Sequence, residues 1–182
     1  ALLQVYKLTA LVSDLLDVSK IESGQLSMSF QEFNIVELLN DVIDVMHYGN
    51  LNHKIIKNCS ASEIIVYADK QRIEQVMINL VSNAIKYSPD GDRVIVSVHD
   101  HEGSVLVSIQ DFGIGINAED QPQIFSRFYR VEELASFIAG LGIGLYISQD
   151  IMERHGSVIT VDSHYGVGST FSFKLPAQRG LS

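Results

Sequence analysis

The sequence has few of the features that mark several large classes of proteins. Its 13 basic residues are outnumbered by 22 acidic ones, and the formal net charge of −9 argues against a nucleic-acid partner, which needs Lys and Arg against phosphate. The single cysteine, Cys59, excludes an internal disulfide and indicates a reducing compartment. The uncharged run at residues 135–149 is too short to span a bilayer. We therefore expect a cytoplasmic domain without direct membrane contact, whether or not a longer parent protein is anchored in a membrane.

The start of the chain also lacks a recognisable signal. Residues 1–10 have neither a basic start nor a small-residue cleavage site, so we expect no signal peptide. The sequence opens in mid-pattern and without Met, so we expect a piece of a longer protein. Its 182 residues, 46% of them hydrophobic, suffice for one globular domain and an appendage.

Hydrophobic spacing predicts helices and strands in an irregular alternation. The predicted helices begin at residues 2, 35, 70 and about 142, and they end near residues 22, 46, 87 and 155. The predicted strands cover residues 54–58, 63–68, 93–99, 105–110, 158–163 and 169–175. The last four of these strands form two β-hairpins. We therefore predict an α+β fold in which helices cover one face of a mixed, largely antiparallel sheet.

The first predicted helix has an apolar stripe that suits a partner helix. Leu8, Leu11, Leu15 and Val18 recur in steps of three and four residues, as in a helix-to-helix seam. Such a stripe also fits an ordinary surface helix that packs on its own domain. The heptad-like spacing at the start of the chain favours a truncated dimerising hairpin over that alternative.

A row of polar residues lies opposite the apolar stripe of the predicted helix 70–87. Asn79, Asn83 and Lys86 are three or four residues apart and therefore share a face. Amide oxygens suit a Mg²⁺ ion that keeps waters and shares phosphate oxygens, so we predict that Asn83 binds the ion and Asn79 binds or orients a coordinated water. Lys86 supplies a point charge for phosphate, and Tyr87 offers a ring and a hydroxyl near a base or ribose. The alternative is that both amides bind neighbouring loops.

An acidic residue and two glycines follow the predicted strand 105–110. Asp111 is placed to accept a hydrogen bond from a base amino group in an otherwise apolar pocket. Gly113 and Gly115 leave room for a flat ring near the backbone, and Ile116 offers apolar contact. Read alone, Asp111 fits a turn-initiating residue equally well.

The segment Gly140–Leu145 combines glycines with the start of a predicted helix. Bare backbone amides at a helix N-terminus bind phosphate, although a tight turn would have a similar pattern. No Lys-Ser/Thr follows, and the spacing is not that of a dinucleotide fingerprint, so both of those nucleotide-binding classes are excluded.

Aromatic and basic residues lie between these glycine segments. We expect Phe125 and Phe128 to anchor a loop to the core, while Arg127 or Arg130 reaches phosphate. Residues 131–139 have the mixed character of a mobile lid. A short helix with a solvated basic face is the alternative.

Taken in order, five segments resemble the ATP-binding catalytic domain of bacterial sensor histidine kinases, whose fold is shared with gyrase, heat-shock chaperone and mismatch-repair ATPases. These segments are Asn79–Pro89, Asp111–Ile116, Phe125–Arg130, Gly140–Ile147 and Gly166–Phe171. Leu15–Gly24 is similar to the end of that family's second dimerisation helix. The resemblance implies a two-layer α/β sandwich at 25–182, after the truncated hairpin helix at 1–24.

The resemblance also implies ATP and Mg²⁺ as cofactors and a role for each matching residue. Magnesium is assigned to Asn83 with help from Asn79. The phosphates are assigned to Lys86 and to backbone amides, those of Leu141, Gly142, Ile143, Gly144 and Leu145. The nucleoside is assigned to Tyr87, Asp111, Gly113, Gly115 and Ile116, with Ser169 touching the base through water. Tyr129 and Arg130 contact nucleotide at the start of the lid, and Lys86 and Arg130 are the candidate catalytic residues.

Two departures from the family pattern affect the functional prediction. Leu141 stands where a small hydroxyl residue is usual, and none of the six histidines lies in the family's phosphoacceptor motif. We therefore expect phosphoryl transfer from ATP to a histidine on an upstream dimerisation domain, within a homodimer formed by the N-terminal helices, for relay to a response regulator. The alternatives are a nucleotide-sensing scaffold without transfer activity and an ATP hydrolase. Hydrolysis is disfavoured because Asn79 is a poor base.

Overall fold

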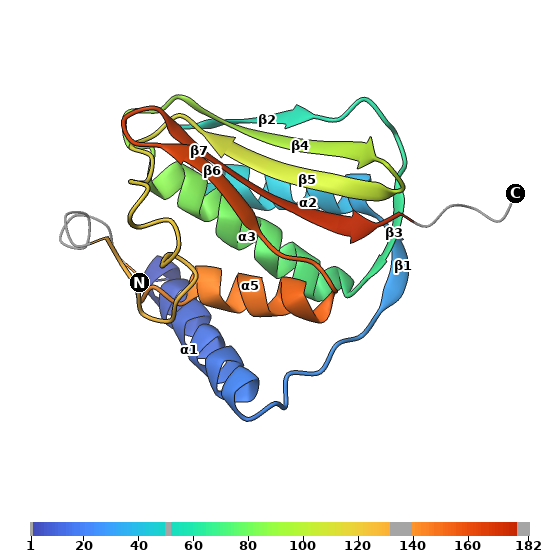
Figure 1. Cartoon of the computed structure of the whole chain (residues 1–182), viewed down its shortest axis with the longest axis horizontal. Helices are drawn as coiled ribbons and strands as arrows, with labels where there is room; N and C mark the ends of the chain where they lie inside the picture. The colour runs from blue at the N-terminus through green and yellow to red at the C-terminus, as the bar shows by residue number, and fades with distance from the viewer. Residues whose placement is uncertain (1, 50–51, 132–139, 178–182) are drawn as a thin grey trace, which may run out of the picture.

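The computed structural model describes residues 2–49, 52–131 and 140–177, and these form a sheet covered on one face by helices (Figure 1). The helices are α1 (Leu2–Glu22), α2 (Ile35–Gly49), α3 (Lys70–Lys86) and α5 (Gly144–Arg154). The strands are β1 (Gln31–Asn34), β2 (Lys54–Asn58), β3 (Ile65–Ala68), β4 (Arg93–His101), β5 (Ser104–Asp111), β6 (Thr160–His164) and β7 (Gly168–Pro176). Helices α2, α3 and α5 lie against the sheet, and α1 lies outside α5.

The main sheet has five strands in the order β2-β4-β5-β7-β6. Only the β2–β4 pair is parallel, and the other three pairs are antiparallel, which confirms the prediction of a mixed, largely antiparallel sheet with helices on one face. Strand β3 instead pairs with β1 in a separate two-stranded sheet. Sequence spacing does not reveal β1, because Phe33 is its only apolar residue.

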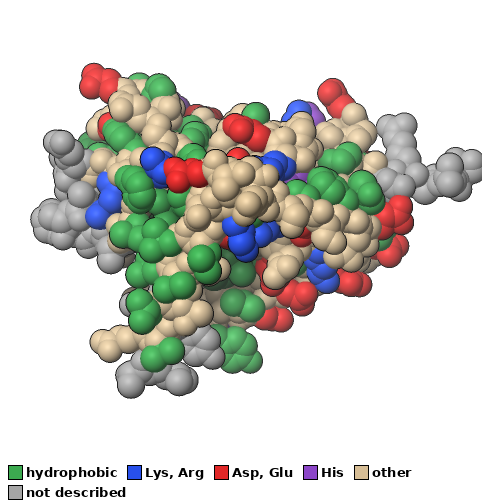
Figure 2. Space-filling view, turned by 90° about the horizontal axis from the view of Figure 1, so that it is seen from below, with side chains coloured by type: hydrophobic (Ala, Val, Ile, Leu, Met, Phe, Trp, Pro, Cys, Tyr) green, Lys and Arg blue, Asp and Glu red, His purple; other side chains and the backbone are tan. Residues whose placement is uncertain are grey.

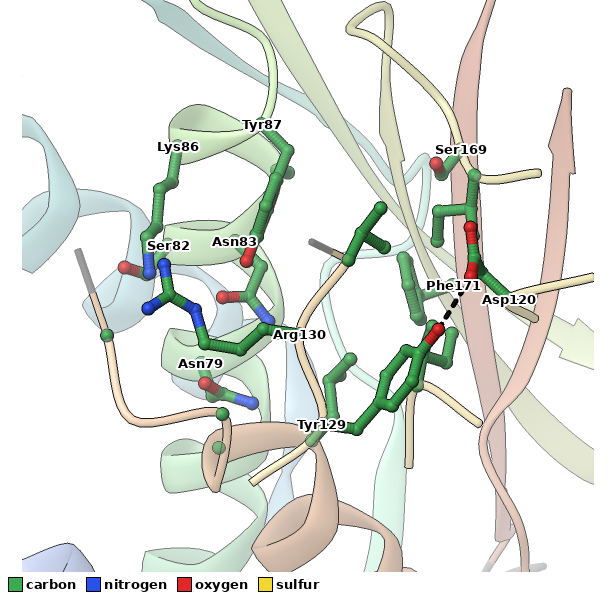
Figure 3. A pocket seen from close by; sticks show the side chains of 18 of the residues that line it. Asn79, Ser82, Asn83, Lys86, Tyr87, Asp120, Tyr129, Arg130, Ser169 and Phe171 are labelled. Carbon is green, nitrogen blue, oxygen red and sulfur yellow. Dashed lines mark hydrogen bonds between the residues drawn. The ribbon is translucent and has the colours of Figure 1, made fainter. Parts of the chain in front are cut away.

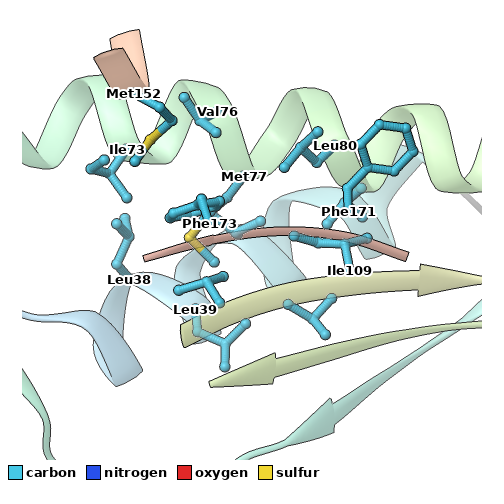
Figure 4. Close-up of a cluster of buried hydrophobic side chains, with 14 of the residues drawn as sticks. Leu38, Leu39, Ile73, Val76, Met77, Leu80, Ile109, Met152, Phe171 and Phe173 are labelled. Carbon is cyan, nitrogen blue, oxygen red and sulfur yellow. The ribbon is translucent and has the colours of Figure 1, made fainter. Parts of the chain in front are cut away.

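The core fills the space between the sheet and the three covering helices (Figure 4). Every second residue of β5 is buried, so this strand presents one apolar face to the helices. Phe173 of β7 and Met77 of α3 are among the largest fully buried side chains and meet in this layer. Helix α3 has the predicted apolar stripe, and its buried residues are Ile73, Val76, Met77, Leu80, Val81 and Ala84.

Helix α3 is held firmly at its start. Asp69 is the N-cap of α3, and its carboxylate accepts a hydrogen bond from the backbone N–H of Arg72 at 3.1 Å. Its second oxygen accepts from the backbone N–H of Ser29 at 2.8 Å. At the other end, the hydroxyl of Ser88 donates to the carbonyl of Ala84 at 2.6 Å. These contacts set the position of the polar row that α3 carries.

Helix α1 is attached to the domain by its C-terminal half. The Asp17 carboxylate is buried and accepts hydrogen bonds from Arg72 at 3.0 Å and from the Gln75 side chain at 2.8 Å. An ion pair joins Glu22 to Arg127.

The apolar stripe of α1 is only partly used by these contacts. Val18 is buried, and Ile21 packs against the core. Figure 2 shows a group of hydrophobic side chains on the side of the molecule where α1 lies, and the exposed ones on α1 are Val5, Leu8, Leu11, Val12, Leu15 and Leu16. The structure therefore leaves an apolar helix face available for a partner.

Replacing Asp17 with Ala should loosen the attachment of α1. The change removes the Asp17 acceptor from the half-buried side chains of Arg72 and Gln75, and such a loss typically costs about 1–3 kcal/mol. We expect that loss in urea unfolding, together with faster proteolysis within residues 2–22. Asp92→Ala is the control, because Asp92 forms only an exposed pair with Arg93 at 3.6 Å and should cost below about 0.5 kcal/mol. Equal effects of the two changes would contradict the importance of the Asp17 contacts.

Candidate functional site

A cavity of about 280 Å³ opens between α3, the N-terminus of α5 and the ends of β5 and β7 (Figure 3). Its volume lies just below the range of about 300–1,000 Å³ usual for small-molecule sites. Of the predicted site residues, all but Gly113 line it, namely Asn79, Asn83, Lys86, Tyr87, Asp111, Gly115, Ile116, Tyr129, Arg130, Leu141, Gly142, Ile143, Gly144, Leu145 and Ser169. Segments far apart in the sequence thus meet at one place.

One end of the cavity is cationic. Lys86 of α3 and Arg130 both line it, and Figure 3 shows the two side chains on the same side as Asn79 and Asn83. Burial, and secondly the nearby charge of Arg130, lower the pKa of Lys86. Both causes make the positive charge of Lys86 unfavourable in the free protein. An anionic ligand would reduce that free-energy cost by placing negative charge beside Lys86 and Arg130.

The two amides of the polar row have different surroundings. The Asn79 side chain donates a hydrogen bond to the Ser148 hydroxyl of α5 at 2.9 Å. For Asn79, this contact agrees in part with the alternative prediction that the two amides bind neighbouring segments instead of a metal. A Cβ on Gly144 would lie 2.3 Å from the Asn79 amide oxygen, so the glycine is what lets this amide sit against α5. Among the described residues, the Asn83 side chain has no hydrogen-bond partner, and it lines the cavity.

The N-terminus of α5 supplies unused donors to the cavity. The helix begins at Gly144, two residues later than predicted, and Ile143 at the N-cap position gives no side-chain hydrogen bond. The first backbone N–H groups of a helix have no partner within the helix, and they attract anions together with the helix dipole. Gly142, Ile143, Gly144 and Leu145 all line the cavity, so these donors face the same space as Lys86 and Arg130.

The opposite end of the cavity has an acid in an apolar setting. Asp111 is the last residue of β5 and is buried, with Ile124 and Phe171 among its neighbours in the cavity wall. Burial raises the pKa of Asp111, and hydrogen bonds from the backbone N–H groups of Gly113 and Ser169 partly offset this effect. The carboxylate is a hydrogen-bond acceptor fixed by two backbone contacts.

Gly113 and Gly115 have another reason for lacking side chains than the one expected from sequence. A Cβ on Gly113 would lie 2.1 Å from the carbonyl oxygen of Tyr87, and one on Gly115 would lie 2.0 Å from that of His164. Both glycines let two chain segments approach each other closely. Gly115 also lines the cavity, whereas Gly113 does not.

The segment before the predicted lid differs from the sequence prediction at one position, Phe128. Phe125 does pack on the core, with its ring edge-on to Phe171 at 6.5 Å. Phe128 is 54% exposed and does not anchor the loop. Arg127 pairs with Glu22 of α1, so Arg130 is the arginine that reaches the cavity. The predicted lid at 131–139 lies, apart from Val131, outside the described residues.

Sequence reasoning did not identify several residues that line the cavity. Asp120 accepts a hydrogen bond from the Tyr129 hydroxyl at 2.6 Å and so positions that ring. Leu11 and Asp14 come from α1, and they bring the N-terminal helix into the wall of the site. Burial, and secondly the charge of Asp17, raise the pKa of Asp14. None of these positions belongs to a glycine or amide motif, so no local pattern marks them.

The comparison with family models matches residues 68–179, more than half of the chain, to the histidine kinase-, DNA gyrase B- and HSP90-like ATPases. The chain therefore belongs to that ATPase family. Within the family it is an ATP-binding catalytic domain of the sensor histidine kinase type, as its relatives of known sequence and structure show. Membership in this family supports nucleotide binding by the domain.

Sensor histidine kinase WalK of Bacillus subtilis (strain 168) is 36% identical over 174 residues, which are 93% of this chain and 28% of WalK. The chain thus spans little more than a quarter of that relative. The catalytic domain of histidine kinase ThkA is 31% identical with a TM-score of 0.71, and the match covers 82% of this chain and 98% of that domain. A second ThkA structure, a complex with the response regulator protein TrrA, is 28% identical with a TM-score of 0.73. The match covers 94% of this chain and 48% of that ThkA chain.

Full-length ShkA in complex with AMPPNP is 26% identical with a TM-score of 0.80, and the match covers 94% of this chain and 36% of ShkA. Of the helices within the described residues, none is long and apolar enough to cross a membrane.

Replacing Gly144 with Ala should weaken nucleotide binding without destabilising the fold. The new Cβ would displace the Asn79 amide from its place against α5. Loss of that placement should raise the dissociation constant for ATP about tenfold, while Ala at a helix start changes stability by less than about 1 kcal/mol. Calorimetric titration and urea unfolding measure the two effects. Glu153→Ala, on the exposed side of α5, is the control. Unchanged ATP binding by Gly144→Ala would contradict this prediction.

Replacing Asp14 with Asn should stabilise the protein and tighten ATP binding at neutral pH. A raised pKa in the folded state means that the ionised Asp14 costs stability, and the cost disappears as pH falls through the folded pKa. The gain from Asn should therefore shrink on acidification toward the ordinary range of carboxyl groups. Urea midpoints across pH test this, with Asp44→Asn on the exposed face of α2 as control. A gain that does not depend on pH would contradict it.

Proposed function

We propose that residues 25–182 bind Mg·ATP and transfer its γ-phosphoryl group to a histidine on an upstream dimerisation domain. The observation that supports this most strongly is the polarity of the cavity. Lys86, Arg130 and the free N–H groups of α5 gather at one end, and the fixed acceptor Asp111 lies at the other. A ligand with a polyanionic tail and a base that bears an amino group fits both ends at once.

The residues at the cationic end fit a Mg²⁺ ion that travels with the nucleotide. The described residues contain no group of three or more His, Cys, Asp or Glu that could hold a metal by themselves, so a metal here would rely on amides, water and phosphate oxygens. Asn83 would bind the ion, because its amide oxygen has no hydrogen-bond partner among the described residues. Asn79 is held by Ser148 and would orient a coordinated water. When bound, the ion supplies positive charge against the phosphates.

The transfer step needs positioning and charge stabilisation from this chain. A ring nitrogen of the acceptor histidine attacks the γ-phosphorus, the bond to the β–γ bridging oxygen breaks, and ADP leaves with that electron pair. Lys86 and Arg130 are placed to stabilise negative charge on the phosphoryl oxygens. The N–H groups at the start of α5 hold the remaining phosphates, which keeps the leaving oxygen in line. Leu141 adds only its backbone amide, so the usual hydroxyl contact is absent.

The partners follow from the surroundings of α1. We assign residues 1–24 to the end of a dimerisation hairpin, because the exposed apolar face of α1 needs a second helix, and a homodimer through the N-terminal helices supplies it. The complex of ThkA with TrrA supports a response regulator as the recipient of the phosphoryl group. The need for ATP and the free Cys59 favour the cytoplasm as the location of the reaction. The residues that line the cavity give no reason to expect nucleic-acid binding.

Transfer is tested by incubating the chain with γ-labelled ATP, Mg²⁺ and a separately supplied dimerisation hairpin that carries the acceptor histidine. We expect acid-labile label on the hairpin. Asn83→Ala should lower Mg²⁺-dependent ATP binding and transfer by at least about tenfold, because it removes the proposed metal ligand.

Asn58→Ala is the matched control, since Asn58 lies on β2 and is exposed. Binding of ATP without any phosphohistidine would refute the proposed transfer and leave a nucleotide-binding module.

A further inference from the structure

Ser163, the fourth residue of β6, is buried behind the nucleoside end of the cavity and joins three chain segments. Its hydroxyl accepts a hydrogen bond from the backbone N–H of Ile116 at 2.8 Å and donates to the carbonyl of Gly168 at 3.1 Å. The hydroxyl of Ser169 lies 2.8 Å away. Ser163 does not line the cavity, whereas Ile116 and Ser169 do.

The hydrogen count of this cluster decides what Ser169 offers to a ligand. A serine hydroxyl has one hydrogen and two lone pairs. Because Ser163 gives its hydrogen to the Gly168 carbonyl, the contact between the two hydroxyls needs the hydrogen of Ser169. Ser169 is then left with lone pairs only, so its hydroxyl is an acceptor toward the cavity.

This acceptor stands beside a second one. Asp111 and Ser169 face each other in the β5–β7 pairing, and the backbone N–H of Ser169 bonds to the Asp111 carboxylate. Both side chains line the base end of the cavity. A pair of acceptors favours a ligand edge that presents N–H donors, either directly or through a water, and it opposes a carbonyl oxygen.

The backbone around Ser163 holds the facing wall in the same place. The Gln121 side chain donates to the carbonyls of Ser163 at 3.0 Å and of Ile116 at 3.2 Å. Gly115 packs directly on the His164 carbonyl. The loop after β5 is thus fastened to β6 on both sides of Ile116, and the Ser163 hydroxyl is the central contact.

We infer that Ser163 is a positioning residue that sets the donor and acceptor pattern of the base end and so selects a 6-amino purine over a 6-keto purine. The inference rests on the proposed function, because it concerns how the same site tells nucleoside triphosphates apart. It assigns the selectivity to a side chain that never touches the ligand. Removing the Ser163 hydroxyl frees the hydrogen of Ser169 to donate to a keto oxygen and leaves the Ile116 N–H without its partner.

The test compares dissociation constants of ATP, inosine triphosphate and inorganic tripolyphosphate by calorimetry, in wild type and Ser163→Ala. We expect Ser163→Ala to weaken ATP binding about fivefold and to narrow the preference for ATP over inosine triphosphate about tenfold. Tripolyphosphate binding should stay unchanged, which a merely structural defect would not allow. Ser163→Thr keeps the hydroxyl and should restore the preference, and Ser172→Ala on β7 is the matched control.

A double variant shows whether Ser163 acts through Ser169. Ser169→Ala alone should narrow the preference, and adding Ser163→Ala should narrow it little further. Full additivity of the two changes, or an unchanged preference in Ser163→Ala, would overturn the inference. A wild type that binds neither triphosphate would count against the proposed function instead, so the two failures are distinguishable.

Discussion

The placement of α3 depends on one buried carboxylate. Asp69 caps the helix through Arg72, holds the incoming chain through Ser29, and gives its own backbone N–H to the His155 ring at 3.0 Å. His155 follows α5 and bonds to the Ile151 carbonyl at 2.7 Å. The start of α3 and the end of α5 are thereby tied together, and the Asn79–Ser148 hydrogen bond joins the two helices again further along. All the phosphate-side groups of the cavity sit on these two helices or next to them.

The charge of the site runs against that of the whole protein. A chain with a net charge of −9 repels anions at long range, yet the cavity holds Lys86, Arg130 and a helix N-terminus within one small space. Desolvation strengthens each of these contacts and makes their clustering costly until an anion arrives. A bound nucleotide would therefore both fill the site and stabilise it, as expected for a ligand that binds only the folded state.

Sequence patterns predicted the long elements and most of the cavity because those patterns are local. The apolar period of α3 and the glycines at the start of α5 can each be recognised within a short stretch of the sequence. The patterns did not predict β1, the cavity residues Leu11, Asp14 and Asp120, or the exposure of Phe128, because these depend on contacts between distant segments. Gly113 is an example of such a distant contact. It must lack a side chain because the Tyr87 carbonyl lies against it, and no sequence spacing predicts that contact.

Helix α1 has two roles, because it carries exposed apolar side chains and also contributes Leu11 and Asp14 to the wall of the cavity. Successive residues of an α-helix are turned by about 100° around its axis. A twist of that size would withdraw the Asp14 carboxylate and bring Ser13 or Leu15 toward the nucleotide. A rotation of α1 about its own axis would thus change the electric potential inside the cavity.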